Sequence, residues 1–407
     1  MELSQPVNLR GVEIVGQPHI GAPLMQTRRL AVSSLILIGL IARASAQEPP
    51  KPAWKYSPEL LRPFWQGETV EGESVLFIKD EKSGEARASV LFPIREVLTV
   101  RSSVGEVTYE SGRDFVWKPD SREIVLPAGS RIPSRTPQEL RRPAKTQKYE
   151  LTHRDGNGEI FFGGRLEYAE MQTCITYRHA PDLWKGTVPK FDPKTLPRSV
   201  ARLTNRQTLS IVTLGDSIST GLNASGLFDT APYQPAYPEL VRRQLAERFH
   251  GQVEMKNLSV GGTDTGWGLT QIDKVVDAQP HLVILAFGMN DSASRTPQSF
   301  QENTKNMIAK IREKLPECEF ILVATMLGNR DWVRLKHEAF PQYRDALKEL
   351  VEPGVALADL TSIWTGFLEL KKDWDQTGNG VNHPNDFGHR IYAQVLSALL
   401  IPQPPGD

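Results

Sequence analysis

The feature that most constrains the fold of this chain is the alternation of apolar runs and helical segments after Arg202. Five runs are predicted to be β-strands. Three of them are continuous apolar stretches bounded by glycine, which is typical of parallel strands covered on both faces. The five runs are residues 208–215, 252–260, 281–288, 319–326 and 354–360. We therefore predict an α/β domain of three layers with a five-stranded parallel sheet over residues 200–402.

The segments between these runs carry helix signals. In residues 296–315, Thr296 can act as the N-cap and Pro297 stands in the first turn. The apolar side chains that follow on one face are Phe300, Met307, Ile308, Ile311 and Leu315. Residues 384–400 form the last predicted helix, because apolar residues recur there at every fourth position. Asp386 is interpreted as a favourable charge at the N-terminus of that helix.

The first half of the chain has a different pattern. A length of 407 residues suggests two domains. Between Ser74 and Tyr177, short β-like runs alternate with turn sequences such as SGRD and RDGNGE, and no long helical period interrupts them. We predict a small β-sandwich over residues 67–190. Proline-rich stretches at 47–66 and 187–199 flank it, and the first of them is interpreted as a linker.

The beginning of the sequence resembles a secretory leader. Two arginines precede an apolar run at residues 30–42, and the small residues 44–46 form a cleavage site before Gln47. The run is too short to span a bilayer comfortably, so we expect no stable membrane insertion. We predict that residues 1–46 are a signal peptide with the natural start at Met25, and that the protein is secreted or periplasmic.

Charge and cysteine content exclude some classes of partner. Lys plus Arg and Asp plus Glu both number 48, so no net field favours nucleic acid or an anionic membrane surface. Cys174 and Cys318 either pair in the oxidising compartment or remain separate buried thiols, and the sequence leaves both alternatives open. No cysteine-rich metal pattern occurs.

Polar residues collect where the predicted strands end. In open α/β sheets, sites form beyond the carboxyl ends of the strands. The residues found there are Gly215-Asp216-Ser217, Gly261-Gly262, Asn290-Asp291 and, in the loop before the last helix, Asn382-His383. A serine hydroxyl needs a neighbouring imidazole to become a nucleophile, and the oxyanion that its attack creates needs N–H donors. The backbone N–H groups of Ser217 and Gly262 and the side-chain amide of Asn290 can supply three donors.

Each of these features also has a plain structural interpretation. Asp216 or Ser217 can simply cap a helix, and the two glycines can form an ordinary turn. Asn290 can likewise stand in a turn, and His383 can fill a buried polar position. Their joint occurrence in this order, each at a predicted strand or loop end, favours acyl-transfer chemistry.

The sequence here resembles a known family. GDSIS, NLSVGGT, GMND and the late NHP are similar to the four blocks of the SGNH, or GDSL-type, esterases and lipases, over about residues 205–402. The resemblance implies Ser217 as nucleophile and His383 as general base. It also implies oxyanion donors from Ser217, Gly262 and Asn290, a flavodoxin-like strand order, and chemistry without a metal or an organic cofactor.

One position departs from the family pattern. Many members carry an aspartate three residues before the histidine, where it orients the imidazole, and here that position is Gly380. Asp373 or Asp375 from the same loop could supply the third group. Alternatively, a backbone carbonyl could hold the imidazole N–H and leave a Ser217–His383 dyad. We favour the dyad.

The substrate is the least constrained part of the prediction. A secretory leader and a β-domain ahead of the hydrolase resemble the layout of bacterial carbohydrate acetylesterases, so we expect removal of acetyl groups from a polysaccharide or oligosaccharide. A lysophospholipase or general carboxylesterase is the alternative enzyme, and a glycan-binding protein without activity is the alternative class. Four tryptophans are either sugar-stacking platforms or ordinary packing residues. They are Trp267, Trp332, Trp364 and Trp374.

Overall fold

The computed structural model describes residues 54–402. The predicted signal peptide, with its start at Met25, lies outside the described residues, as does the first part of the proline-rich segment 47–66. The described part of that segment contains a 3-10 turn, Glu59–Leu61 (η1). None of the helices between residues 54 and 402 combines the length and the apolarity needed to cross a membrane.

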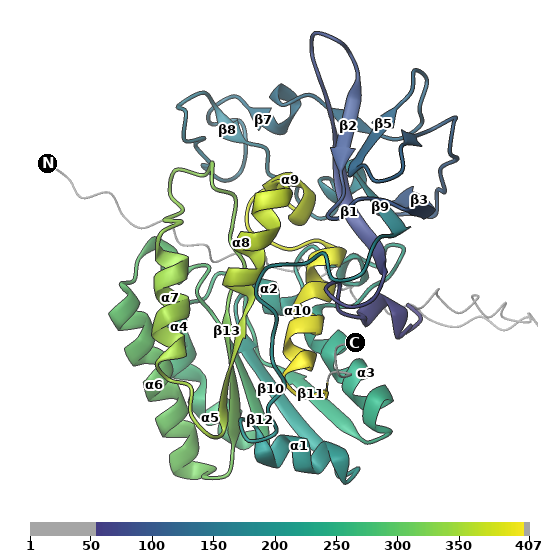
Figure 1. Cartoon of the computed structure of the whole chain (residues 1–407). Coiled ribbons are helices and arrows are strands. Elements are labelled where there is room, and N and C mark those ends of the chain that lie inside the picture. Colours follow the sequence, from purple (N-terminus) through teal and green to yellow (C-terminus); the bar gives the residue numbers. More distant parts are fainter. Residues whose placement is uncertain (1–53, 403–407) are drawn as a thin grey trace, which may run out of the picture. The chain divides into compact units, whose positions relative to one another are not determined.

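The second half of the described chain is built on a five-stranded sheet (Figure 1). Its strands are β10 (Leu209–Gly215), β11 (Val253–Asn257), β12 (Leu282–Ala286), β13 (Glu319–Ala324) and β14 (Val355–Asp359). They lie in the order β11-β10-β12-β13-β14, and every neighbouring pair is parallel. The predicted flavodoxin-like α/β fold is therefore confirmed, and the five predicted strands are the five observed.

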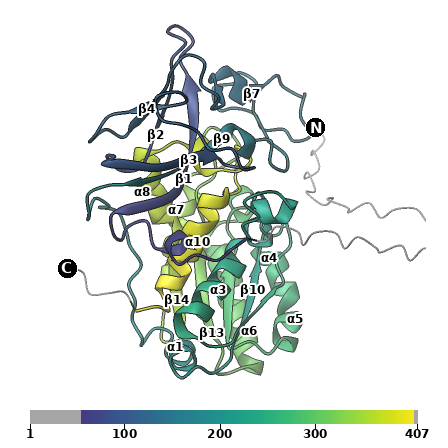
Figure 2. The same ribbon diagram turned by 90° about the vertical axis from the view of Figure 1, so that its right-hand side faces the viewer.

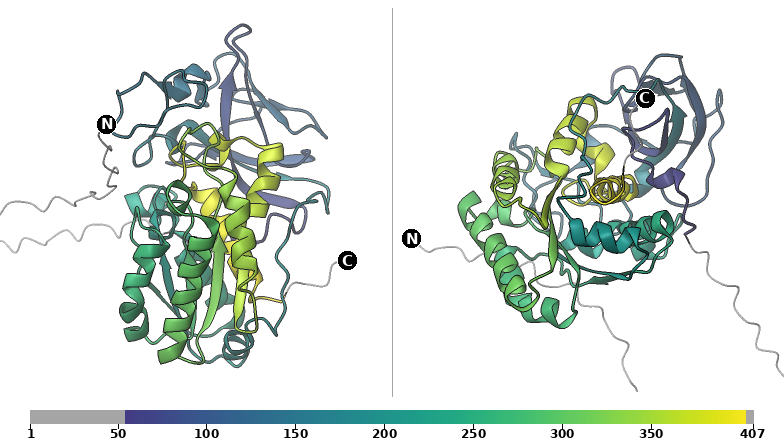
Figure 3. Two further views of the ribbon diagram at one scale, coloured as in Figure 1. Left: turned by 90° about the vertical axis from the view of Figure 1, so that its left-hand side faces the viewer. Right: turned by 60° about the horizontal axis from the view of Figure 1, so that its bottom comes forward.

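Helices cover both faces of this sheet (Figure 3). The helices are α1 (Pro197–Thr204), α2 (Ser217–Thr220), α3 (Tyr237–Phe249), α4 (Thr265–Gly268), α5 (Ile272–Asp277), α6 (Pro297–Lys314), α7 (Ala339–Lys348), α8 (Leu360–Leu370), α9 (Asp373–Gln376) and α10 (Asp386–Ala398). Strand β10 shows how the core divides. Leu209 and Ile211 pack with α1, α3, α8 and α10 on one face. Val212 and Leu214 pack with α5, α6 and α7 on the other face.

Helices α6 and α10 show what the residues at their N-termini do and how α10 is buried. The hydroxyl of Thr296 accepts the backbone N–H of Ser299 at 3.2 Å, so the predicted N-cap of α6 is present. In α10, every residue after Asp386 is buried. Helix α3 packs against α10, and so do the segments η1 and β1. Asp386 does more than favour the helix terminus, since its carboxylate accepts the N–H of Ser225 at 2.9 Å.

The first half of the described chain is rich in β-structure, as predicted (Figure 2). Its strands are β1 (Thr69–Lys79), β2 (Ala86–Ser89), β3 (Glu96–Ser102), β4 (Val116–Trp117), β5 (Glu123–Leu126), β6 (Ser134–Arg135), β7 (Arg141–Arg142), β8 (Glu159–Ile160) and β9 (Gln172–Arg178). Strand β1 is central: it pairs with β9 along residues 69–76, and its end pairs with β2 and β6. We call residues 67–190 the β-rich region.

The proline-rich segment before the β-rich region packs on the α/β core. Leu61 and Phe64 are buried. The ring centroid of Phe64 lies 4.7 Å from that of Phe367 in α8 and 4.9 Å from that of Trp184. Burial of a side chain of this size stabilises a fold by roughly 1.5–3 kcal/mol.

The two cysteines are separate. Cys174 lies in β9 and Cys318 directly before β13, and both are buried free thiols. The disulfide alternative is therefore not realised in the structure. Burial raises the pKa of Cys318 to about 12, so this thiol stays protonated and unreactive at neutral pH.

Candidate active site

Ser217 occupies the first position of the short helix α2, one residue after the end of the interior strand β10. Asp216 is the N-cap of this helix, and its carboxylate accepts the N–H of Ile218 at 2.9 Å. The cap therefore belongs to Asp216, and the hydroxyl of Ser217 is left for another partner. Burial, with a contribution from Asp291, raises the pKa of Asp216 to about 7.

The partner of Ser217 is His383, from the loop between α9 and α10. Nε2 of His383 lies 2.9 Å from Oγ of Ser217, although the two residues are far apart in the sequence. Burial, with a smaller contribution from His389, lowers the pKa of His383 to about 3. The imidazole is therefore neutral at neutral pH, which is the form that can accept a proton.

The other ring nitrogen of His383 faces an amide. Nδ1 lies 2.9 Å from Oδ1 of Asn223. The amide nitrogen of Asn223 donates to the backbone oxygens of Arg165, at 2.6 Å, and Gly378, at 3.0 Å. Because these two carbonyls fix the direction of the amide, Oδ1 must face the imidazole. An acceptor at this position places the ring proton on Nδ1 and leaves the lone pair of Nε2 facing Ser217.

A second asparagine shapes the loop that carries His383. Oδ1 of Asn379 accepts the backbone N–H groups of Val381, Asn382 and His383 at 2.9–3.2 Å. Its amide nitrogen lies 3.0 Å from Nδ1 of His383 and 3.1 Å from Oδ1 of Asn382. When Nδ1 carries its proton, the amide of Asn379 donates to Asn382 instead.

The structure explains the glycine at the position where the family pattern has aspartate. Gly380 has a φ of +82°, a conformation that L side chains rarely adopt. A Cβ at this position would lie 2.5 Å from the backbone oxygen of Phe161 and 2.7 Å from the ring of Tyr168. The β-rich region therefore fills the volume that an orienting carboxylate would need.

The two candidate carboxylates of the same loop have other partners. Asp375 accepts the N–H groups of Leu76, at 2.8 Å, and Lys372, at 3.1 Å. Asp373 lies 3.4 Å from the guanidinium of Arg330. Within residues 54–402, the side chains that contact Nδ1 of His383 are those of Asn223 and Asn379, neither of which is a candidate carboxylate.

Two of the three predicted oxyanion donors, Gly262 and Asn290, lie in the loops after β11 and β12, and the third is the backbone N–H of Ser217. Gly262 has a φ of +76°. The amide nitrogen of Asn290 donates to the backbone oxygen of Thr263 at 2.8 Å, which leaves its second hydrogen for a ligand. Asp291 ties the two loops together by accepting the N–H groups of Gly288 and Thr265, each at 3.1 Å. Burial raises the pKa of Asp291 to about 6.

Asn223 was not found from the sequence, where a backbone carbonyl was the favoured partner of the imidazole. One weak signal exists. Asn223 follows the end of α2 at Gly221 and has a φ of +67°, a conformation that asparagine tolerates better than most residues. The signal locates a turn, but it does not indicate that the side chain of Asn223 reaches His383.

The tryptophans differ in their surroundings. Trp364 is 1% exposed and lies in the core, so it is excluded as a sugar platform. Trp267, Trp332 and Trp374 are partly exposed, and each packs against an apolar cluster. Within residues 54–402, no three His, Cys, Asp or Glu side chains come together as a set that could hold a metal ion.

Most of the α/β region matches the sequence model of a known protein family. Residues 213–391, somewhat under half of the chain, match the sequence model of the GDSL-like Lipase/Acylhydrolase family. The α/β region belongs to this family. The resemblance predicted from the four sequence blocks is therefore confirmed, and the GDSL-type chain is an enzyme of the carboxylic ester hydrolase class. Among curated proteins, none is similar enough to this chain to count as a match.

Several solved structures are similar to the GDSL-type region. The lipase Lip_vut3 from a goat rumen metagenome is 18% identical, with a TM-score of 0.38, and the alignment covers 46% of this chain and 95% of that one. A two-domain esterase, CEX, active on acetylated mannans is 19% identical, with a TM-score of 0.42 and coverage of 54% and 58%. A lipase/acylhydrolase from Enterococcus faecalis is 23% identical, with a TM-score of 0.37 and coverage of 46% and 93%. Because these TM-scores lie below 0.5, the family assignment rests on the sequence match.

Proposed function

We propose that the chain is a serine esterase that cleaves carboxylic esters through an acyl-enzyme. Ser217 is the nucleophile, His383 is the general base, and Asn223 is the group that orients the imidazole. One observation carries this assignment. The lone pair of His383 Nε2 faces the Ser217 hydroxyl at 2.9 Å, while the opposite ring nitrogen faces the Asn223 amide oxygen at the same distance.

The reaction follows from this arrangement. The oxygen of Ser217 attacks the ester carbonyl carbon, and its proton passes to Nε2 of His383. The carbonyl oxygen becomes an oxyanion that accepts hydrogen bonds from the N–H groups of Ser217 and Gly262 and from the amide of Asn290. The intermediate expels the alcohol, which takes the proton from His383. Water then attacks the acyl-Ser217 ester through the same histidine and releases the acid.

We further propose that the substrate is an acetylated polysaccharide or oligosaccharide met outside the cytoplasm. The leader-like sequence of residues 1–46 supports the location. The rim of the site supports a short acyl group. Among the described residues, the exposed large apolar side chains in the segments between β10, β11 or β13 and the next long helix are single ones, Leu227, Val260 and Val333. A long acyl chain needs a continuous apolar surface.

Labelling of the active serine tests the assignment of the nucleophile. A fluorophosphonate probe should label the wild-type protein and leave Ser217→Ala unlabelled. An unlabelled wild type would favour a glycan-binding protein without activity.

Acetate release tests the substrate class. The protein should release acetate from acetylated glycans and hydrolyse p-nitrophenyl acetate much faster than a long-chain p-nitrophenyl ester. Preference for the long-chain ester, or release of fatty acid from lysophospholipid, would overturn the glycan proposal and leave the serine esterase in place.

A further inference from the structure

The loop that carries His383 has little regular structure of its own. We call residues 371–385 the histidine segment. Within it, the only helix among the described elements is α9, which has four residues, Asp373–Gln376. The geometry of His383 therefore depends on what the histidine segment is bound to. On the α/β side, Asn329 holds it by donating to the backbone oxygens of Gly380, at 2.8 Å, and Val381, at 2.6 Å.

The β-rich region holds the segment from the opposite side, at the residues that surround the imidazole. The backbone oxygen of Arg165 accepts the amide of Asn223 at 2.6 Å, and this bond sets the direction of the amide that faces His383. The backbone N–H of Gly163 donates to the backbone oxygen of Asn379 at 3.1 Å. Both asparagines that contact Nδ1 of His383 are therefore fixed by residues 163–165 of the β-rich region.

One buried side chain of strand β9 extends this contact. The amide nitrogen of Gln172 donates to the backbone oxygens of Trp374, at 2.7 Å, and Thr377, at 2.8 Å. Its amide oxygen accepts from Asn385 at 3.1 Å, and Asn385 also donates to the hydroxyl of Ser74 in β1 at 2.9 Å. Gln172 thus binds the histidine segment on both sides of His383.

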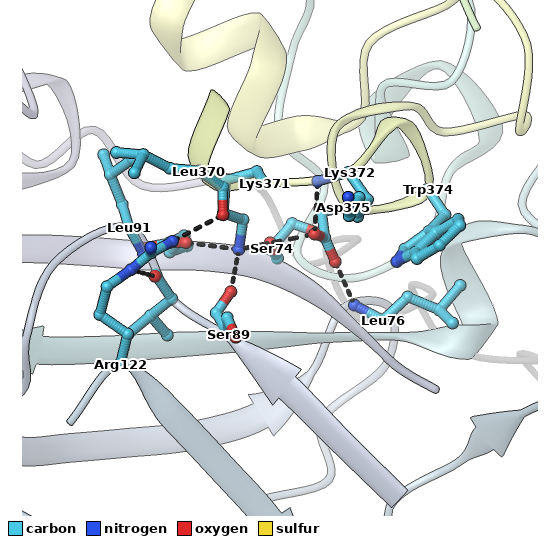
Figure 4. A network of polar contacts seen from close by, with 12 residues as sticks. Ser74, Leu76, Ser89, Leu91, Arg122, Leu370, Lys371, Lys372, Trp374 and Asp375 are labelled. Atoms are coloured by element: carbon cyan, nitrogen blue, oxygen red, sulfur yellow. Dashed lines mark hydrogen bonds and ion pairs between the residues drawn. The ribbon is translucent and has the colours of Figure 1, made fainter. Parts of the chain in front are cut away.

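The start of the segment is fixed by charges (Figure 4). The ammonium of Lys371 lies 2.6 Å from the carboxylate of Glu73 in β1, and both side chains are fully buried. It also donates to the backbone oxygen of Ser89 at 2.6 Å. The carboxylate of Asp375 accepts the N–H of Leu76, again in β1, at 2.8 Å. Removing one partner of a buried charge pair leaves an unpaired buried charge and strongly destabilises the fold, so the pair fixes the position of the segment.

We propose that the β-rich region positions His383 for catalysis, through Arg165 and Asn223 and through the contacts of Gln172 with the histidine segment. The inference rests on the proposed function, because it concerns the same serine esterase site. Gln172 is a positioning residue, since it touches neither the substrate nor the reacting atoms. The β-rich region is then a part of the hydrolytic site rather than a separate module attached to it.

The experiment uses the full chain and compares two variants. Gln172→Met keeps the volume of the side chain and removes its three hydrogen bonds to the histidine segment. Asp114→Asn is the matched control. Its buried carboxylate binds Arg131 at 2.6 Å and the N–H of Glu110 at 2.8 Å, both inside the β-rich region. Each preparation is titrated with a fluorophosphonate, and kcat and KM for p-nitrophenyl acetate are expressed per labelled serine.

For Gln172→Met, we expect kcat per labelled site to fall by about tenfold or more, because small misplacements of a reacting group have large effects on rate. We expect KM to stay within about twofold, and Asp114→Asn to keep kcat per labelled site within about twofold even if its unfolding midpoint falls. A kcat for Gln172→Met equal to that of Asp114→Asn would overturn the inference. A wild type that is neither labelled nor active would instead overturn the proposed function.

A second variant decides the question if Gln172→Met does not fold. Ser74→Ala removes one hydrogen bond to Asn385 and changes little volume. A fall in kcat of about threefold with an unchanged KM supports the positioning role, and an unchanged kcat contradicts it.

Discussion

Two polar networks hold the histidine segment, and they are built from different chemical groups. The network at its start is charged, with Lys371 between the carboxylates of Glu73 and Asp375. The network around His383 is neutral, with the amides of Asn223 and Asn379 beside the imidazole. The charged groups take no part in the proton transfer of the proposed reaction. The imidazole must gain and lose a proton, and amides orient it without stabilising either charge state strongly.

The effect of neutral rather than charged neighbours is visible in the pKa of His383. A neighbouring carboxylate would stabilise the imidazolium and raise the pKa. Beside an amide, the effect of burial is not opposed, and the pKa falls to about 3. The geometry also favours an amide over a carboxylate at position 223. A carboxylate there would place an oxygen against the carbonyls that now accept from the amide nitrogen at 2.6 and 3.0 Å.

The largest expected effect comes from removing the centre of the neutral network. His383→Ala leaves Ser217 without a base, and we expect kcat/KM for p-nitrophenyl acetate to fall by about 10⁴-fold or more. The unfolding midpoint in urea serves as the control for folding. Activity within tenfold of wild type would show that the neutral network does not carry the chemistry.

The next effect comes from the amide that orients the ring. In Asn223→Leu, the side-chain amide of Asn379 remains beside Nδ1 at 3.0 Å. This amide donates and therefore favours the tautomer with the proton on Nε2. We expect kcat to fall by about 10³-fold, because the wrong tautomer cannot accept the serine proton. Steady-state hydrolysis of p-nitrophenyl acetate measures kcat, and the rate of fluorophosphonate labelling reports the attack by Ser217 directly.

Asn223→Asp sharpens the same prediction. It restores an acceptor for Nδ1 and should recover part of the rate, while the acid limb of the pH profile moves upward and stability falls. Equal rates for Asn223→Leu and Asn223→Asp would contradict the role of tautomer selection.

The charged network should respond in stability. Lys371→Met leaves the fully buried carboxylate of Glu73 without its counter-ion, and we expect the free energy of unfolding to fall by about 3–5 kcal/mol. The double variant Lys371→Met/Glu73→Gln should recover more than half of this loss, because a neutral amide then replaces the carboxylate nearest to position 371, while the carboxylate of Asp375 keeps its two backbone N–H donors. Urea unfolding followed by tryptophan fluorescence measures both. A double variant no more stable than the single one would show that the charge pair is not the source of the effect.

The smallest expected change is in the pH profile. Hydrolysis requires neutral His383, so kcat/KM falls as the pH drops through the pKa of this group in the free enzyme. With a pKa of about 3, we expect protonation of His383 to change kcat/KM by less than about twofold between pH 8 and pH 5. A histidine with the ordinary value of about 6.5 would lose about 30-fold by pH 5. An acid limb centred near pH 6.5 would contradict the burial effect.

The parts of the fold that the sequence predicted are those that depend on local patterns. The apolar runs around β10 and β12 predict parallel strands because both faces of each strand are buried. Thr296 and Pro297 predict the start of α6 for an equally local reason. Ser217 and His383 followed from the rule that sites form at the carboxyl ends of the strands, and the structure places them at hydrogen-bond distance.

The remaining parts depend on contacts that residue types in a sequence do not reveal. The contacts of Arg165 and Gly163 are made by backbone atoms, which every residue has. Asn223 lies 160 positions from His383, and only the tertiary fold brings them together. Asp373 and Asp375 likewise have partners in distant segments, Arg330 and Leu76. The loop sequence alone therefore indicates carboxylates near the histidine but not where they point.

The tight contact at Gly380 limits how this enzyme can be rebuilt. An engineer who wished to install a carboxylate there would first have to reshape the chain at Phe161 and Tyr168, whose atoms lie within 3 Å of where the new Cβ would stand. The same contact limits recombination of the two halves with other proteins. A chimera that exchanged the first half of this protein for an unrelated carbohydrate-binding module would inherit a hydrolase half with an unfilled hollow beside its histidine, so we expect the two halves to be inherited together.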